Sequence, residues 1–166
     1  MFSCFSRKAV STRQCQLDVT LHQIQYIEDN YLNNITYKDT VPYVHQLHRG
    51  KVIKVYDGDT ITIAAKLLYL ENSPIYRFSI RLRGIDTPEI KTKSLIEKEF
   101  AEKAQHALSD LILHKIVYLT DVGMDKYGRV LANVYYEKIN ISKWMLEKGY
   151  AVEYNGKTKQ IPDEWK

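Results

Sequence analysis

Four short segments contain carboxylates and arginines of the types that act on phosphate groups: Asp57-Gly58-Asp59-Thr60, Ile80-Arg81-Leu82-Arg83, Asp86-Thr87-Pro88-Glu89 and Asp125-Lys126-Tyr127-Gly128-Arg129. Carboxylates that outnumber nearby cations repel one another, and a domain can hold them close when a hard cation such as Ca²⁺ or Mg²⁺ neutralises them. Arginines added to such a group imply an anionic substrate, because the planar guanidinium pairs with two phosphoryl oxygens. Together the segments indicate metal-assisted attack on a phosphodiester, with guanidinium groups binding the charge of the transition state.

Each segment alone has a simpler structural explanation. The Asp57-Gly58-Asp59 segment is a common hairpin turn, and we interpret Asp57 as a turn residue behind the site. The segment from Asp86 to Glu89 could lead into a helix, although Ser94 is a better cap. A lone arginine is most often a surface charge. The occurrence of all four segments in this order favours one site.

Other site chemistries fit the sequence less well. A calcium-binding EF-hand loop that starts at Asp57 would need glycine and an acidic residue where Thr62 and Leu68 stand. His106 and His114 have no cysteine nearby, so a zinc site is not indicated. The sequence also lacks a poised histidine or serine, which argues against nucleophilic catalysis by the protein.

The order and approximate spacing of these segments resemble those of staphylococcal nuclease (thermonuclease) homologues, from about residue 49 to residue 154. The resemblance implies Ca²⁺ ligands at Asp59, Asp86 and the backbone carbonyl of Thr87, where Mg²⁺ or Mn²⁺ could also bind. It implies that Arg81 and Arg129 are catalytic and grip the phosphate. The third catalytic residue that it implies is Glu89, beside the attacking water.

The same resemblance implies substrate binding by Lys126, Tyr127 and Tyr154. The implied function is a Ca²⁺-dependent endonuclease that cuts DNA and RNA with little sequence specificity and leaves 5′-hydroxyl and 3′-phosphate ends. Single-stranded or locally melted nucleic acid is the favoured substrate, and a monomer is assumed. The alternative is a module of the same fold that only binds nucleic acid. Because the five catalytic and metal-binding side chains are all present, the enzyme is favoured.

The composition is that of one globular domain with an appendage. The 166 residues are 45% hydrophobic and 27% charged, and the net charge of +4 comes entirely from residues 49–166. This positive charge mildly favours polyanionic partners. No apolar run is long enough for a membrane span, and both cysteines, Cys4 and Cys15, lie outside the expected core.

The chain start shows no secretory signal, so we expect an intracellular and specifically cytoplasmic protein. Two alternatives stay open. The acid-free start resembles an organelle-targeting peptide, and Cys4 between two phenylalanines is a candidate for acylation.

Hydrophobic periodicity predicts the elements that must position these residues. Residues 1–48 form an N-terminal extension with a disordered start, an amphipathic helix at about 17–33 and a linker. Residues 49–166 form the domain that resembles the nuclease family, with strands at 52–55, 61–65, 76–82, 116–120 and 130–135. A capping box of Ser94 and Glu97 begins a long helix, and Asn140 caps a short one. The predicted fold is mainly β with α (α+β): a five-stranded Greek-key barrel of OB type with flanking helices.

Overall fold

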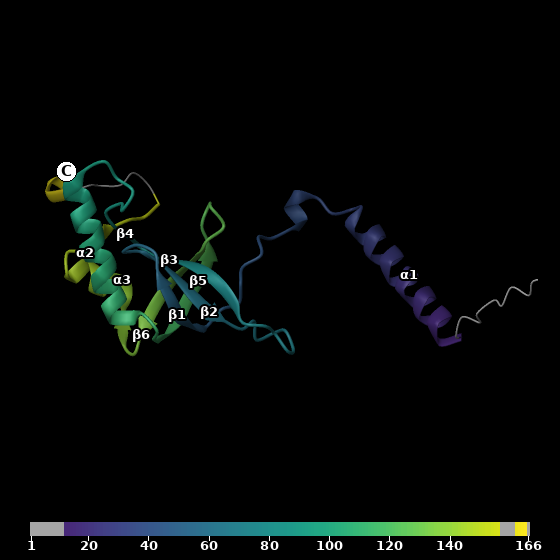
Figure 1. Ribbon diagram of the computed structural model, residues 1–166. Helices are drawn as coiled ribbons and strands as arrows, with labels where there is room; N and C mark the ends of the chain where they lie inside the picture. Colours follow the sequence, from purple (N-terminus) through teal and green to yellow (C-terminus); the bar gives the residue numbers. More distant parts are fainter. Residues whose placement is uncertain (1–11, 157–161, 166) are drawn as a thin grey trace, which may run out of the picture. The chain divides into compact units, whose positions relative to one another are not determined.

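The computed structural model describes residues 12–156 and 162–165 (Figure 1). The chain divides into two compact units, the first ending at Tyr43 and the second beginning at Val44. The predicted disordered start and the candidate acylation at Cys4 concern residues outside the described part of the chain.

The first unit consists mainly of α1 (Thr12–Leu32), which begins earlier than the predicted helix at 17–33. A single-turn 3-10 helix, η1 (Tyr37–Asp39), follows it, and the Asp39 carboxylate accepts a hydrogen bond of 2.9 Å from the backbone N–H of Thr36. Apolar side chains of α1, among them Leu21 and Ile27, are exposed. None of the helices in the described ranges is both long enough and apolar enough to cross a lipid bilayer.

The second unit contains a closed barrel of five strands (Figure 1). Antiparallel pairs join β1 (Arg49–Val55) to β2 (Thr60–Ala65), and β2 to β3 (Tyr76–Leu82). Antiparallel pairs also join β1 to β5 (Ile116–Met124), and β5 to β6 (Val130–Tyr136). A parallel pair between β3 and β6 closes the barrel. The predicted OB-type α+β fold is confirmed, whereas the sequence pattern did not reveal the parallel closure.

Alternating side chains of these strands fill the barrel. Val52, Ile61, Ile80, Val117 and Val134 have no exposed surface, and each lies next to more exposed neighbours along its strand. Burying one such side chain stabilises the fold by roughly 1.5–3 kcal/mol. The inward positions therefore build the core, and the outward positions of the same strands are left to solvent.

Two helices flank the barrel. The long helix α2 (Leu95–Ile112) begins at Ser94, and it buries the residues Ala101, Ala104, Leu108 and Ile112 at helical spacing. The short helix α3 (Ile141–Glu147) begins at Asn140, whose side-chain oxygen accepts a 3.0 Å hydrogen bond from the backbone of Lys143. Both caps were predicted from the sequence.

Four short elements complete the described part of this unit. Strand β4 (Ile85–Asp86) pairs with β8 (Val152–Glu153), and β7 (Ile139–Asn140) extends the sheet beside β6. A C-terminal 3-10 helix, η2 (Asp163–Trp165), lies against α2. Within η2 the Trp165 side chain is 3% exposed. The pairing of β4 with β8 matters for function, because it fixes the position of Asp86.

Candidate active site

The turn between β1 and β2 is packed tightly against α2. The backbone N–H of Tyr56 donates a 2.9 Å hydrogen bond to Thr60, which closes the turn. A Cβ atom at Gly58 would lie only 2.9 Å from side-chain carbons of both Ala104 and Thr87. Only glycine fits this contact, and the contact fixes the position of the neighbouring Asp59.

Asp59 and Asp86 are held together by one arginine. Arg81 uses one terminal nitrogen to form an ion pair with Asp59 Oδ2 and the other to bind Asp86 Oδ1 at 2.7 Å. The Arg81, Asp59 and Asp86 side chains are 12%, 5% and 11% exposed. Asp59 Oδ2 also accepts a hydrogen bond of 3.2 Å from the backbone N–H of Thr87. The residues predicted as metal ligands therefore lie in one buried cluster, with Arg81 as their counter-ion.

The donor chemistry of this cluster suits a hard cation. Two carboxylates and the nearby backbone of Thr87 provide oxygen atoms, which Ca²⁺ and Mg²⁺ prefer. In the described part of the chain, no three side chains of His, Cys, Asp or Glu gather as metal ligands. A cation here would thus rely on Asp59, Asp86 and carbonyl oxygen, and it would share these carboxylates with Arg81, whose single charge offsets only one of them.

A hairpin between β5 and β6 positions Arg129, Tyr127 and Lys126. Asp125 accepts hydrogen bonds from the backbone N–H groups of Tyr127 and Arg129, at 2.8 and 2.9 Å, and from Arg129 Nε at 2.7 Å. Burial raises the pKa of Asp125, but these hydrogen bonds outweigh it and hold that pKa below its ordinary value. The terminal nitrogens of Arg129 make no hydrogen bond with any residue that the structure describes, so they are available to an anion.

Tyr127 is the most exposed aromatic ring of this hairpin, at 72%. The Lys126 ammonium lies 5.0 Å from the centre of the ring, and the Arg129 guanidinium carbon lies 5.6 Å from it. Both distances are typical of cation–π contacts. The ring therefore presents an open surface flanked by two positive charges.

The charges of Arg81 and Arg129 both influence the carboxylate of Asp57. The parallel pairing of β3 with β6 aligns Ile80 with Val130, and Arg81 and Arg129 are their neighbours in the sequence. Burial raises the pKa of Asp57 above its ordinary value, while a hydrogen bond with Thr60 and the charges of Arg81 and Arg129 act in the opposite direction. The sequence alone assigned Asp57 to the turn.

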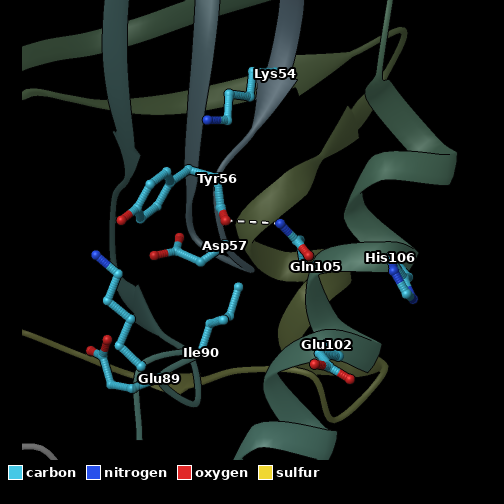
Figure 2. A pocket seen from close by; sticks show the side chains of 9 residues that line it. Lys54, Tyr56, Asp57, Glu89, Ile90, Glu102, Gln105 and His106 are labelled. Atoms are coloured by element: carbon cyan, nitrogen blue, oxygen red, sulfur yellow. Dashed lines mark hydrogen bonds between the residues drawn. The ribbon is translucent and has the colours of Figure 1, made fainter.

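Glu89 lies at the edge of a cavity of about 610 Å³ that Asp57 also lines (Figure 2). Its side chain is exposed and makes no hydrogen bond or ion pair with the described residues. Gln105 closes another side of the cavity by donating a 2.8 Å hydrogen bond to the backbone oxygen of Tyr56. Glu89 therefore has a free carboxylate that faces solvent close to Asp57.

The loop that carries Glu89 is held by Glu97, a contact that the sequence did not indicate. Glu97 Oε1 accepts a 3.2 Å hydrogen bond from the backbone N–H of Glu89. The predicted capping box is only half present: Ser94 accepts from the Glu97 backbone, but Ser94 N–H donates to Thr92 instead. The Glu97 carboxylate thus positions the Glu89 loop.

Tyr154 follows β8, next to the turn between β3 and β4. Its backbone N–H donates a 3.0 Å hydrogen bond to Gly84, and β8 places Val152 opposite Asp86. The structure thus joins Arg81, Asp59, Asp86 and Thr87 by direct contacts. The hairpin residues, Glu89 and Tyr154 come from three other segments, and these contacts do not include their side chains.

The comparisons with known proteins agree with the motifs. The family described as staphylococcal nuclease homologue matches residues 79–164. An uncharacterized endonuclease of Haemophilus influenzae is 41% identical over 104 residues, which cover 63% of this chain and 51% of that protein. A probable endonuclease of Schizosaccharomyces pombe is 32% identical over 151 residues, which cover 78% of this chain and 64% of that protein.

A micrococcal nuclease of Shigella flexneri is 32% identical over 120 residues, which cover 66% of this chain and 61% of that protein. The chain thus spans between about half and two thirds of the length of these relatives.

Proposed function

Because the chain belongs to the staphylococcal nuclease homologue family, we propose that it is a Ca²⁺-dependent endonuclease that hydrolyses phosphodiester bonds in DNA and RNA. It cuts with little sequence specificity and leaves 5′-hydroxyl and 3′-phosphate ends. The observation that carries this proposal is the buried cluster in which Arg81 pairs with both Asp59 and Asp86, beside the backbone of Thr87.

Arg129 binds the scissile phosphate. Asp125 fixes its Nε, so the two terminal nitrogens point a planar fork at an incoming anion without further ordering of the side chain. Charge that develops on the phosphoryl oxygens in the transition state is stabilised by this guanidinium. Arg81 adds a second guanidinium when it exchanges a carboxylate partner for a phosphoryl oxygen.

Glu89 orients the attacking water or takes its proton. Its carboxylate is exposed and unpaired in the described part of the chain, so its oxygens are open to a hydrogen bond from water. The Glu97 contact holds the backbone of the loop, so the carboxylate keeps its place at the cavity edge.

Asp59, Asp86 and the carbonyl of Thr87 would hold a divalent cation, which would supply charge neutralisation at the phosphoryl group and a more acidic water. Ca²⁺ is the proposed ion, and Mg²⁺ or Mn²⁺ could use the same oxygens.

Single-stranded or locally melted nucleic acid is the proposed substrate. The open ring of Tyr127 can stack on a base only when that base is not already stacked in a duplex. Lys126 next to this ring adds attraction for a phosphate, and Tyr154 contacts the nucleotide from the other segment.

A second candidate is a module that binds nucleic acid without cutting it. The ion pairs of Arg81 favour this candidate, because they occupy both carboxylates and offset one of the two negative charges without any metal. The endonuclease should cleave nucleic acid, whereas the module should bind it and leave it intact.

Cleavage of a supercoiled plasmid and of a folded RNA, with each divalent ion in turn and with EGTA, tests the proposal. Glu89→Gln should lower the rate by about 10²–10⁴-fold. Glu102→Gln is the matched control, because Glu102 lines the same cavity, and its rate should not change. Product ends that accept phosphate from polynucleotide kinase without phosphatase treatment identify 5′-hydroxyls. An intact substrate with every ion, despite binding, would refute the enzyme and support the module.

A further inference from the structure

The first three strands of the barrel are unusually rich in positive charge. Together β1, β2 and β3 contain five cations, Arg49, Lys51, Lys54, Arg77 and Arg81, and no aspartate or glutamate. The opening residues of β5, 116–120, also lack carboxylates. Elsewhere in the domain charges are balanced, as on α2, where Lys98 and Lys103 pair with Glu102 and Glu99.

Strand alternation places these cations on the outer face of the barrel. In β3 the side chains of Phe78, Ile80 and Leu82 are buried, so Arg77 lies on the opposite face, the same one as Arg81. In β1, Arg49, Lys51 and Lys54 are exposed while Val52 is buried. The charged side chains of both strands therefore share one surface.

The strand register arranges this face in rows that cross the sheet. One row runs from Arg77 through Ala64 and Lys51 to Ile116. The next row toward the candidate active site contains Ser79, Thr62 and Lys54. The side chains between the cations, those of Ala64, Thr62 and Ser79, are thus small, and the positively charged side chains flank a shallow surface.

An aromatic ring lies at the far end of this surface. Tyr118 of β5 is the register partner of Arg49 and is 50% exposed. Arg49, Lys51 and Arg77 form no ion pair within the described residues. We call Arg49, Lys51, Lys54, Arg77 and Tyr118 the basic sheet face.

We propose that the basic sheet face binds the stretch of single-stranded nucleic acid that leads away from the phosphate at Arg81. Arg77 lies four residues from Arg81 on the same face of β3, about 13 Å along the strand. Unpaired cations attract phosphates, and Tyr118 offers a ring on which a base can stack. The proposal rests on the proposed function, because the substrate strand at the active site is the one that continues over this face.

Salt-dependent binding tests this inference separately from cleavage. The probe is a fluorescent single-stranded DNA of about 16 nucleotides, the upper end of the range for one OB fold. Binding is measured by anisotropy in the Glu89→Gln background, so that the strand stays whole. The test variant adds Lys51→Gln and Arg77→Gln. The control adds Lys143→Gln and Lys148→Gln, which remove the same charge from exposed positions around α3.

Loss of two phosphate contacts on single-stranded DNA should reduce the slope of log K against log salt by about 1.4. Between 50 and 200 mM salt, the parent should then lose about sevenfold more affinity than the test variant. Tyr118→Ala should weaken binding at every salt concentration without changing the slope. Thermal melting of each variant confirms that it is folded.

An equal slope change in the test and control variants would show that only net charge matters, and it would overturn the inference. An unchanged slope in the test variant would overturn it as well. Neither result depends on cleavage. If the protein cuts nucleic acid but the slope is unchanged, the proposed function stands and the role of the basic sheet face is refuted. If the protein never cuts, the expected slope change can still be observed.

Discussion

Replacement of Arg81 by methionine should strongly destabilise the domain when no divalent ion is present. Methionine keeps most of the length and apolar contact of the arginine stem but removes its charge. Arg81 is the counter-ion of Asp59 and Asp86, and the side chains of all three are at least 88% buried. The substitution therefore leaves two carboxylates buried close together without their shared cation.

Removing one partner of a buried ion pair costs about 3–5 kcal/mol. The compact unit of residues 44–166 has about 120 residues, for which the entropy of unfolding is roughly 0.25 kcal/mol per degree. The Tm should thus fall by about 10–20 °C. Adding Asp59→Asn to Arg81→Met should recover part of this loss, because one uncompensated charge disappears with it.

Thermal melting followed by circular dichroism in EDTA measures the effect. Lys103→Met is the control, because Lys103 pairs at 2.6 Å with Glu99 and both side chains are exposed, at 58% and 68%. An exposed pair contributes only about 0–1 kcal/mol, so the control should lose a few degrees at most. Addition of Ca²⁺ should raise the Tm of Arg81→Met more than that of the parent, since a cation replaces the lost charge. Equal melting curves for Arg81→Met and Lys103→Met would refute the view that Arg81 stabilises the buried carboxylates.

Three further predictions concern the turn and the hairpin. Gly58→Ala should lower stability by about 1–3 kcal/mol in urea denaturation, because its Cβ would lie 2.9 Å from that of Ala104; an unchanged midpoint would contradict the tight contact. Asp125→Asn should lower the Tm at pH 7, and the difference should shrink as the pH falls below about 4, because a lowered carboxylate pKa contributes stability only while the group is ionised. A difference that is the same at pH 7 and pH 3 would show that this charge has no role. Arg129→Lys should lower kcat by about 10²–10³-fold, far beyond any effect on the Tm from the lost Nε bond to Asp125, since lysine keeps the charge but loses the planar fork; full activity would remove Arg129 from catalysis.

Local patterns in the sequence were enough to predict the elements of the barrel. Alternation in β3 and helical spacing in α2 follow directly from which side chains must face the core. The caps at Ser94 and Asn140 depend on residues only three positions apart. The short strands β4, β7 and β8 escaped prediction, since two residues are too few to show a period.

The partners of the site residues could not be predicted in the same way. The exception is the ion pair of Asp125 with Arg129, which is local to one turn because the two residues lie four positions apart. The contact of Glu97 with the Glu89 backbone replaced half of a predicted capping box, because the folded loop brings another N–H within reach of the carboxylate. Asp57 was assigned to a turn, and only the folded barrel brings it under the influence of two arginine charges.

By itself the sequence determined the kinds of groups present and their spacing along the chain: two arginines, a set of carboxylates and the strands and helices that carry them. The tertiary structure decided which of these groups meet. Arg81 reaches Asp59 because β2 and β3 pair in a register that sets Thr60 opposite Arg81. The segment that contains Arg129 lies beside β3 because β3 and β6 close the barrel in parallel. Such contacts depend on the pairing of distant segments, which no local pattern of side chains records.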